Sequence, residues 1–224
     1  MTTKRVPSTL RKQRVLLVDD HATVREGFTE LINHSPDLQV CGEAKTAAEA
    51  MDAVARLKPN VAVVDLSLQG GSGLDLIKNL KALHPRLPML VVSMHEEQLY
   101  AARALQAGAL GYVMKREAFK TVLTAIRTVL RGAVFLSRNV REQLLHQMVG
   151  GVPRPQCTGV AQLSDRELEV FELIGEGRTT RQIAGKFHLS VSTVDTHRAH
   201  IKEKLNLSNP AELMRAAVEW ASSR

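Results

Sequence analysis

The sequence predicts an α/β domain with a five-stranded, doubly wound parallel sheet, followed by a smaller all-α unit of four helices. From Arg14 to about residue 135, short β-branched runs alternate with stretches that carry apolar residues at helical spacing, a pattern typical of βα units. After a segment rich in Gly and Pro, only helical patterns follow. A chain of 224 residues, 44% of them hydrophobic, is long enough to bury two such cores.

The predicted strands are short, and three of them are almost entirely apolar, as strands covered on both faces must be. They comprise residues 15–18, 38–43, 61–64, 89–93 and 112–114. Five helices are expected to alternate with them, because apolar residues recur three and four apart. Their apolar stripes are Val24, Phe28, Leu31 and Ile32; Ala50, Val54 and Leu57; Leu74, Ile77, Leu80 and Leu83; Leu99, Ala102 and Leu105; Val122, Ile126, Val129 and Leu130.

The second unit begins after a predicted linker, residues 136–162, which contains a polar helical stretch at 138–148. Ser164 and Glu167 have the spacing of a capping box, which predicts a helix start. Further helices are predicted over residues 180–186 and 191–205, and from Pro210 onward with Ser208 or Asn209 as its cap. The tight break at residues 188–190 between two of these helices indicates a helix-turn-helix.

The net charge of +7 does not by itself locate a nucleic-acid surface. Residues 1–14 hold five basic side chains and no acid, whereas residues 15–135 and 160–224 are each balanced. We expect residues 1–13 to form a basic, disordered arm. No apolar run is long enough for a signal or a membrane span, and Cys41 and Cys157 lack metal-binding spacing, so we expect a cytoplasmic protein.

Polar side chains lie at the carboxyl ends of four predicted strands. Open parallel sheets bind their ligands at this edge. Asp19 and Asp20 follow the first strand and Asp65 follows the third; three converging carboxylates would repel unless a cation such as Mg²⁺ joined them. Ser93 ends the fourth strand and Lys115 follows the fifth. Together they predict a site for an acyl phosphate, in which a carboxylate attacks phosphorus while metal and lysine neutralise charge. A single Asp at a strand end is more often a helix cap, so the prediction depends on all four ends.

The helix expected over residues 191–205 is the one that would enter the major groove of DNA. Val194, Ile201 and Leu205 form its predicted buried stripe. The opposite face and its flanks supply the predicted DNA contacts, Ser192, Thr193, Asp195, Thr196, His197, Arg198, Ala199, His200 and Lys202. Thr196 and Ala199 suit a thymine methyl group and Asp195 suits cytosine, although so weakly basic a segment also fits an ordinary solvated face.

The residues at the strand ends resemble those of two-component response regulators of the NarL/FixJ class, and the resemblance covers nearly the whole chain. It implies a flavodoxin-like receiver domain in which Asp65 is the phosphoacceptor. It also implies that Mg²⁺ is bound by the side chains of Asp19, Asp20 and Asp65 and by the backbone carbonyl of Ser67.

The same resemblance implies a switch formed by Ser93, Tyr112 and Lys115. In such a switch, the hydroxyl of Ser93 moves to the phosphoryl group and the ring of Tyr112 turns inward. This chain has Leu68-Gln69 where the family usually has Met-Pro, and Arg116 where it often has proline. Neither departure removes a chemical group that the site needs.

The second unit is similar to a LuxR-type helix-turn-helix domain, from Leu163-Ser164-Asp165-Arg166-Glu167 through Gln182-Ile183-Ala184 to residues 192–197. The two resemblances imply a transcription regulator that is not an enzyme beyond its own phosphorylation and dephosphorylation. The implied partners are a sensor histidine kinase or phosphotransfer protein and double-stranded DNA, read by a homodimer that forms on phosphorylation. The expected domains are the receiver, residues 14–135, and the DNA-binding domain, residues 163–224. The sequence does not decide whether phosphorylation activates by unmasking the recognition helix or by dimerisation.

Three alternative functions make different predictions. A phosphatase of the haloacid dehalogenase type also uses an aspartyl nucleophile, but it carries Asp-x-Asp, and Asp65-Leu66-Ser67 has no second carboxylate. A nucleotide-binding oxidoreductase would have a Gly-x-Gly-x-x-Gly turn where this chain has Asp19-Asp20-His21. A receiver that acts through protein contacts alone would fail to bind its own promoter in a gel-shift screen.

Overall fold

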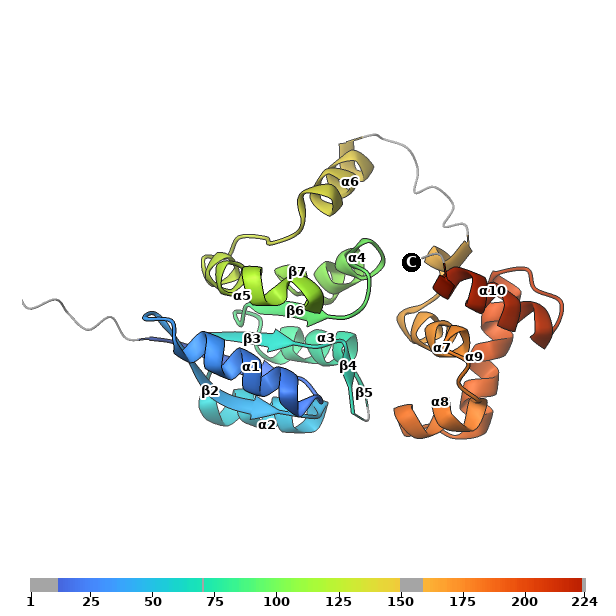
Figure 1. Ribbon diagram of the computed structural model, residues 1–224, viewed down its shortest axis with the longest axis horizontal. Helices are drawn as coiled ribbons and strands as arrows, with labels where there is room; N and C mark the ends of the chain where they lie inside the picture. Colours follow the sequence, from blue (N-terminus) through green and yellow to red (C-terminus); the bar gives the residue numbers. More distant parts are fainter. Residues whose placement is uncertain (1–11, 70, 150–158, 223–224) are drawn as a thin grey trace, which may run out of the picture.

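The computed structural model describes residues 12–69, 71–149 and 159–222 of the chain (Figure 1). Its first part contains the predicted five-stranded parallel sheet, in the order β2-β1-β3-β6-β7. The strands are β1 (Gln13–Val18), β2 (Leu38–Ala44), β3 (Val61–Val64), β6 (Met89–Ser93) and β7 (Gly111–Met114). The strand order reverses beside β1 and β3, which is the point where doubly wound sheets bind their ligands.

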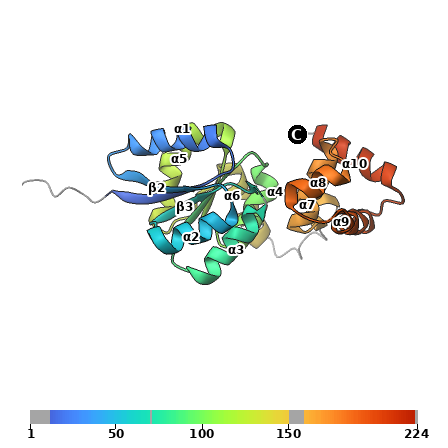
Figure 2. The ribbon, with the colours of Figure 1, turned by 90° about the horizontal axis from the view of Figure 1, so that it is seen from below.

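Helices cover both faces of this sheet (Figure 2). α1 (Ala22–Asn33) and α5 (Lys115–Leu130) lie on one face, and α2 (Ala47–Leu57), α3 (Gly73–Leu83) and α4 (Glu97–Ala107) lie on the other. Every residue of β3, β6 and β7 is consequently buried, which explains why their sequences are continuous apolar runs. The predicted α/β fold is confirmed.

β1 and β3 end level with each other at the carboxyl edge of the sheet, and β6 and β7 each run two residues further. Val18 pairs with Val64, Val64 with Val91, and Val91 with Tyr112. The polar residues that follow these positions therefore emerge at one edge, next to each other.

Two short strands were not predicted: β4 (Ser67–Leu68) and β5 (Gly71–Ser72) form an antiparallel hairpin directly after β3. Strands of two residues are too short to show an alternating pattern. β1 also begins at Gln13, two residues before the predicted strand. Residues 1–11 of the expected basic arm and residues 150–158 of the expected linker, with Cys157, lie outside the described residues.

The helices predicted for the rest of the chain are present among the described residues. α6 (Arg138–Val149) packs beside α4, and a 3-10 turn (Gly159–Gln162) precedes α7 (Asp165–Gly175), α8 (Thr180–Phe187), α9 (Val191–Lys204) and α10 (Pro210–Ser222). Both hydrogen bonds of the predicted capping box are formed at the start of α7. At α10 the cap is Asn209, whose Oδ1 accepts from the backbone N–H of Glu212 at 2.9 Å. No helix among the described residues is long and apolar enough to cross a bilayer.

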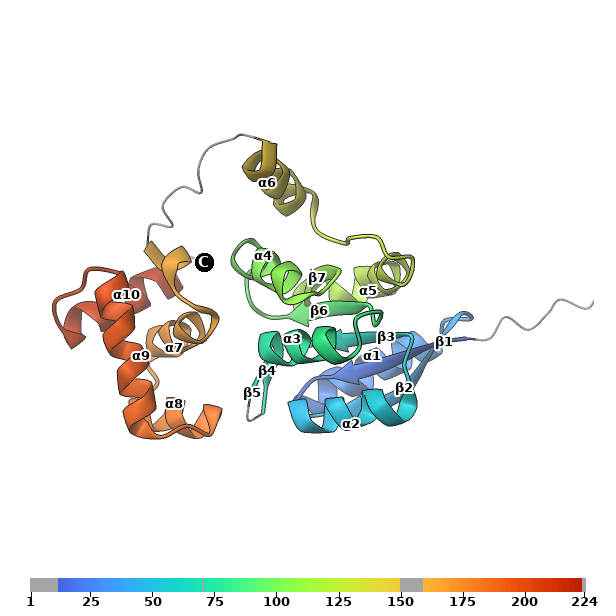
Figure 3. The same ribbon diagram turned by 180° about the vertical axis from the view of Figure 1, so that it is seen from behind.

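The helical unit contacts the α/β domain through α7, which lies between the sheet and α9 in the views of Figures 1 and 3. Buried apolar side chains of the α2, α3 and α4 layer form one cluster with those of the helical unit. The face that α7 turns towards the α/β domain lies at the same edge of the sheet as the predicted site.

Candidate functional site

Asp19, Asp65 and Lys115 meet at the carboxyl edge of the sheet. Lys115 Nζ lies 2.6 Å from Asp19 Oδ2 and 2.7 Å from Asp65 Oδ2. All three side chains are less than a tenth exposed. The structure thus brings together residues from the ends of three strands, β1, β3 and β7, as the sequence predicted.

The charges of these groups are strongly perturbed. Burial raises the pKa of Asp65 above its ordinary value, although Lys115 opposes the shift. Burial would by itself lower the pKa of Lys115, but the carboxylates of Asp65 and Asp19 raise it. The ammonium group is therefore held charged beside the carboxylates. A buried acid with a perturbed pKa at a strand end is typical of a reactive site.

Asp65 has a further oxygen available for chemistry. Its Oδ1 is buried and has no hydrogen-bond partner among the described residues, whereas Oδ2 is bound to Lys115. Oxygen or nitrogen atoms of Asp19, Asp20, His21 and Asp65 all lie within 4.8 Å of one another. Such an oxygen-rich group with an unpartnered buried carboxylate oxygen fits a hard divalent cation.

Ser93 and Tyr112 occupy the neighbouring strands. Ser93 is fully buried at the end of β6, and its Oγ lies 3.4 Å from the backbone N–H of His95. Tyr112 is 1% exposed, and its hydroxyl donates to the backbone carbonyl of His95 at 2.8 Å. The ring packs in the core in this structure, and the inward turn expected on phosphorylation stays a prediction.

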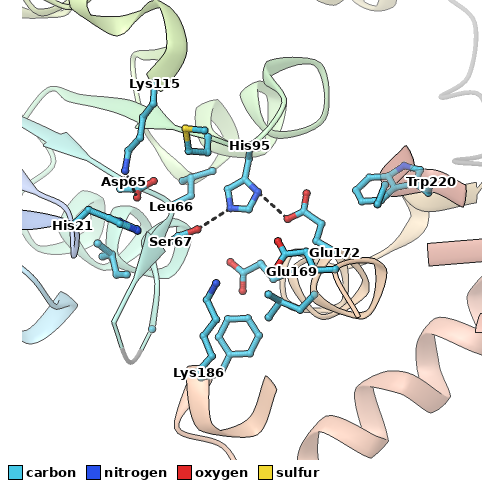
Figure 4. A pocket seen from close by; sticks show the side chains of 17 residues that line it. His21, Asp65, Leu66, Ser67, His95, Lys115, Glu169, Glu172, Lys186 and Trp220 are labelled. Atoms are coloured by element: carbon cyan, nitrogen blue, oxygen red, sulfur yellow. Dashed lines mark hydrogen bonds and ion pairs between the residues drawn. The ribbon is translucent and has the colours of Figure 1, made fainter. Parts of the chain in front are cut away.

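His95 is a central residue of the site that the sequence analysis missed (Figure 4). Its Nε2 lies 2.9 Å from Ser67 Oγ, and its Nδ1 lies 2.8 Å from a carboxylate oxygen of Glu172 in α7. Burial would lower the pKa of His95, but Glu172 and nearby acids raise it above its ordinary value. Its position two residues after the end of β6 was the only signal for it in the sequence.

A buried arginine fixes the backbone of the acidic pair. Arg25 Nη1 donates to the carbonyl of Asp19 at 2.7 Å, and its Nε pairs with Glu43 at 3.1 Å. The side chain of Arg25 is 8% exposed, and it comes from α1, one turn after the acids. The only signal for this contact in the sequence is a basic residue six positions after Asp19.

A cavity of about 420 Å³ adjoins these groups (Figure 4). Asp65, Lys115 and His95 line one side of it, and Glu169 and Glu172 of α7 line the other. The α/β domain and the helical unit thus both contribute walls to the space in front of Asp65.

The predicted DNA-reading helix is α9. Ser190 caps it by accepting from the N–H of Thr193 at 3.0 Å, after a left-handed residue, His188, turns the chain out of α8. Val194 and Ile201 are buried as predicted, whereas Leu205 lies after the helix and is only partly buried.

The predicted contact residues on α9 differ in exposure. Six are exposed and three, His197, Arg198 and Lys202, are half-buried. The exposed ones are Ser192, Thr193, Asp195, Thr196, Ala199 and, at the end of the same face, His200. Thr196 Oγ1 donates to the carbonyl of Ser192 at 3.0 Å, which leaves its methyl group free to face a base.

Comparison with known families gives two matches along the chain. Residues 15–127 match the response regulator receiver domain, and residues 161–217 match the luxR family of bacterial regulatory proteins.

Comparison with individual proteins agrees. The oxygen regulatory protein NreC of Staphylococcus epidermidis is 32% identical over 211 residues, covering 92% of this chain and 97% of that protein. NreC of Staphylococcus aureus is 33% identical over 210 residues, with the same coverage. Among solved structures, RcsB of Salmonella enterica serovar Typhimurium, bound to the promoter rprA with a phosphomimetic BeF3-, superposes with a TM-score of 0.64. That chain is 26% identical, and the match covers 93% of this chain and 99% of RcsB.

Proposed function

The chain belongs to the response regulators that join a receiver domain to a LuxR-type DNA-binding domain, and we propose that phosphorylation of Asp65 controls its binding to DNA. The observation that carries this proposal is the buried Asp65 carboxylate, with one oxygen on Lys115 and the other unpartnered among the described residues. We propose residues 14–135 as the receiver, 136–162 as the linker and 163–224 as the DNA-binding domain.

In the proposed reaction, a carboxylate oxygen of Asp65 attacks the phosphorus of a phosphohistidine on a sensor kinase or phosphotransfer protein. The new P–O bond forms as the P–N bond to histidine breaks, and the imidazole leaves with the electron pair. Lys115 neutralises charge on the phosphoryl oxygens, since it already lies 2.7 Å from Asp65. Ser93 donates its hydroxyl to one of those oxygens. The chain acts on its own aspartate, so it is a regulator and not an enzyme with an outside substrate.

Magnesium is the proposed cofactor of this reaction. The carboxylates of Asp19, Asp20 and Asp65 would hold it, together with the backbone carbonyl of Ser67. When bound, the cation supplies positive charge that offsets the negative charge of the transferring phosphoryl group. Arg25 supports this site by fixing the backbone of Asp19.

DNA is the proposed target of α9. The face predicted to meet the bases holds Asp195, Thr196, Ala199 and Lys202. Thr193, His197, Arg198 and His200 flank it as the predicted phosphate contacts, with Ser192 at the helix start. One related structure describes two RcsB dimers bound to two parallel DNAs. We therefore propose that this chain also binds DNA as a homodimer, on two half-sites about one helical turn apart. Because its proposed target is DNA, the proposed location of the protein is the cytoplasm.

The proposal is tested by incubating the full chain with acetyl phosphate and Mg²⁺ and measuring its intact mass and its mass in solution. The parent is expected to gain one phosphoryl group and to dimerise. Asp65→Asn is expected to gain none, whereas Asp75→Asn, at an exposed acid of α3, should behave as the parent. Equal labelling of Asp65→Asn and the parent would refute the assignment.

A further inference from the structure

A second cavity lies at the edge of the receiver sheet opposite to Asp65, where the strands begin. It has a volume of about 350 Å³ and is lined by Lys12, Gln13, Arg14, Lys58 and Asn60. These residues come from the start of β1, the end of α2 and the segment that leads into β3. In Figures 1 and 3, β1 begins on the side of the molecule that faces away from α7–α10. The cavity is therefore separate from the proposed phosphorylation site and from the helical unit.

The charge around this cavity is entirely positive. Three of the five lining side chains are cations and two are amides, and none of those that the structure describes is acidic. The carboxylate of Asp37, whose backbone carbonyl accepts from the N–H of Gln13 at 2.8 Å, is paired with Arg127 at 2.7 Å. All five side chains can donate hydrogen bonds. Three like charges around one cavity repel one another unless an anion joins them.

One of the three cations is already used by the fold. Lys12 Nζ donates to the backbone carbonyl of Ser35 at 2.9 Å, just beyond the end of α1. A cation at the carboxyl end of a helix complements the carbonyl dipoles there, so Lys12 has a structural role without any ligand. Lys58 follows α2 in the same way, but no described residue accepts a hydrogen bond from its ammonium group. Its side chain is left to the cavity.

Arg14 is the residue that points most directly to a ligand. Its Nε is buried and has no hydrogen-bond partner among the described residues. A buried donor without a partner is costly, and the cost is greater for a charged group. Arg14 and Lys58 are thus two cations with unused donors that line the same space.

The backbone holds these two residues in fixed positions. The N–H of Arg14 donates to Asn60 Oδ1 at 2.8 Å, and the N–H of Asn60 donates to the carbonyl of Arg14 at 2.8 Å. Lys58 lies two residues before Asn60, and its N–H donates to the carbonyl of Val54 at 3.0 Å. Since the frame of the cavity is already ordered, a ligand would pay little to order it.

We propose that Lys12, Arg14, Lys58 and Asn60, here called the amino-edge site, bind a phosphate group. A phosphate offers more acceptor oxygens than a carboxylate, so it can accept from Arg14 and Lys58 together and still reach the amide nitrogen of Asn60. Its negative charge offsets the repulsion between the cations. This proposal goes beyond the proposed function and does not rest on it, because Asp65 lies at the other edge of the sheet.

The phosphate has two sources, a free ion or a nucleotide. A groove of about 530 Å³ adjoins the amino-edge site, and Lys58 and Asn60 line both. Pro59, Leu83 and Pro88 make part of the groove apolar, which suits a ring attached to the phosphate. Phosphate binding is common to both sources, and the experiment separates them.

The amino-edge site is tested by amide NMR spectra of the isotope-labelled full chain, with inorganic phosphate replacing chloride at constant ionic strength. EDTA removes Mg²⁺, so that the carboxylates at the other edge have no cation to attract phosphate. The signals of Gln13, Arg14 and Asn60 should shift with saturation, with a dissociation constant of about 1 mM or lower. Shifts that do not saturate, or that are confined to the neighbourhood of Asp65, overturn the site.

Substitutions test the two free cations. Arg14→Gln keeps both backbone hydrogen bonds to Asn60, and Lys58→Gln alters an exposed side chain, so both variants should fold. Each should weaken phosphate binding by about tenfold or more. Arg56→Gln, at an exposed arginine of α2 outside the cavity, makes the same charge change and should bind as the parent does. Equal weakening in Arg56→Gln, or parental affinity in Arg14→Gln, overturns the site.

Adenosine monophosphate in the same titration identifies the source of the phosphate. Tighter binding than that of inorganic phosphate, with added shifts at Leu83 and Leu87, assigns the adjoining groove to the rest of a nucleotide. Equal affinity assigns the site to free phosphate. Failure of both probes to bind overturns the amino-edge site and leaves the proposed function standing, since phosphoryl uptake on Asp65 is measured separately by mass.

Discussion

Lys115 Nζ lies 2.7 Å from Asp65 Oδ2, and both side chains are less than a tenth exposed. Breaking a buried pair leaves an uncompensated charge, which typically costs about 3 kcal/mol or more. We expect Lys115→Met to lower the free energy of unfolding by about 3 kcal/mol, measured by urea denaturation.

The matched control for Lys115 is Lys120→Met, at an exposed lysine of the same helix, with an expected change within about 0.5 kcal/mol. Adding Asp65→Asn to Lys115→Met should restore part of the lost stability, because it removes one of the two unpaired charges. A double variant no more stable than Lys115→Met would show that the pair is not the cause.

Removal of metal ligands is expected to remove stabilisation by Mg²⁺. A ligand that binds only the folded state stabilises it by about 2.7 kcal/mol at 100 times its dissociation constant. Thermal unfolding of the parent should therefore shift upward with added Mg²⁺, and Asp20→Asn should lose most of the shift. Asp52→Asn, at an exposed acid of α2, is the control and should keep it. An undiminished shift in Asp20→Asn contradicts the ligand assignment.

DNA binding through α9 predicts two different effects of substitution. Arg198→Ala removes a proposed phosphate contact, so it should weaken binding to all sequences and reduce the slope of log affinity against log salt by about 0.9. Thr196→Ala removes a proposed base contact and should change sequence preference instead, by about 1–3 kcal/mol. Gel shifts on the chain's own promoter at several salt concentrations measure both. If the two substitutions together leave affinity unchanged, the helix is misassigned.

Glu167 predicts a pH dependence of stability. Burial would raise the pKa of its carboxyl group, but Lys204, 2.6 Å away, and Ser164 hold that pKa below the ordinary value of 4.5. A pKa lowered by folding stabilises the folded state above 4.5, and this contribution is lost as the pH falls through the lowered value. Glu167→Gln should therefore be destabilised at neutral pH and approach the parent in acid.

Urea unfolding of the parent and Glu167→Gln across this pH range measures the effect, with Glu203→Gln, at an exposed acid of α9, as the control. A constant difference between Glu167→Gln and the parent at all pH values would show that the charge of Glu167 is unimportant.

Gly73 is predicted to tolerate no side chain. A β-carbon there would collide with the backbone of Asp65 and Leu66, which cannot move away as a flexible side chain can. We expect Gly73→Ala to destabilise the chain by about 1–3 kcal/mol and to slow phosphoryl uptake. Gly185→Ala, in a helix with open space around the new carbon, should instead stabilise it by about 0.5–1 kcal/mol. Urea unfolding and mass measurement check both, and equal stabilities would contradict the argument.

The sequence was sufficient to predict the sheet and the meeting of Asp19, Asp65 and Lys115, because strands buried on both faces are continuous apolar runs. Once those runs are aligned, the residues that follow them must share an edge. The β4 and β5 hairpin was too short to predict. The hydrogen bond from the hydroxyl of Tyr112 to the carbonyl of His95 was missed, because no local pattern reveals it.

The contacts of α7 were harder to predict. Asp165, Glu169 and Glu172 have the spacing of one helix face, but that spacing also fits a solvated surface. Their partners lie 62 to 97 residues away for the pairs Arg103–Asp165 and Ser72–Glu169. The periodicity of a helix shows which side chains share a face, whereas only the tertiary arrangement shows what the face contacts.

The level pairing of Val18, Val64 and Val91 makes strand length itself part of the chemistry. Side chains alternate between the two faces of a strand, so one inserted residue in β3 would turn the residue after it towards the opposite layer. Such a chain could still bury its apolar residues and retain α9. It would nevertheless lose the proposed phosphorylation, because the carboxylate of Asp65 would no longer lie at the site. Natural variants of this protein that keep signalling must therefore take their insertions in the loops.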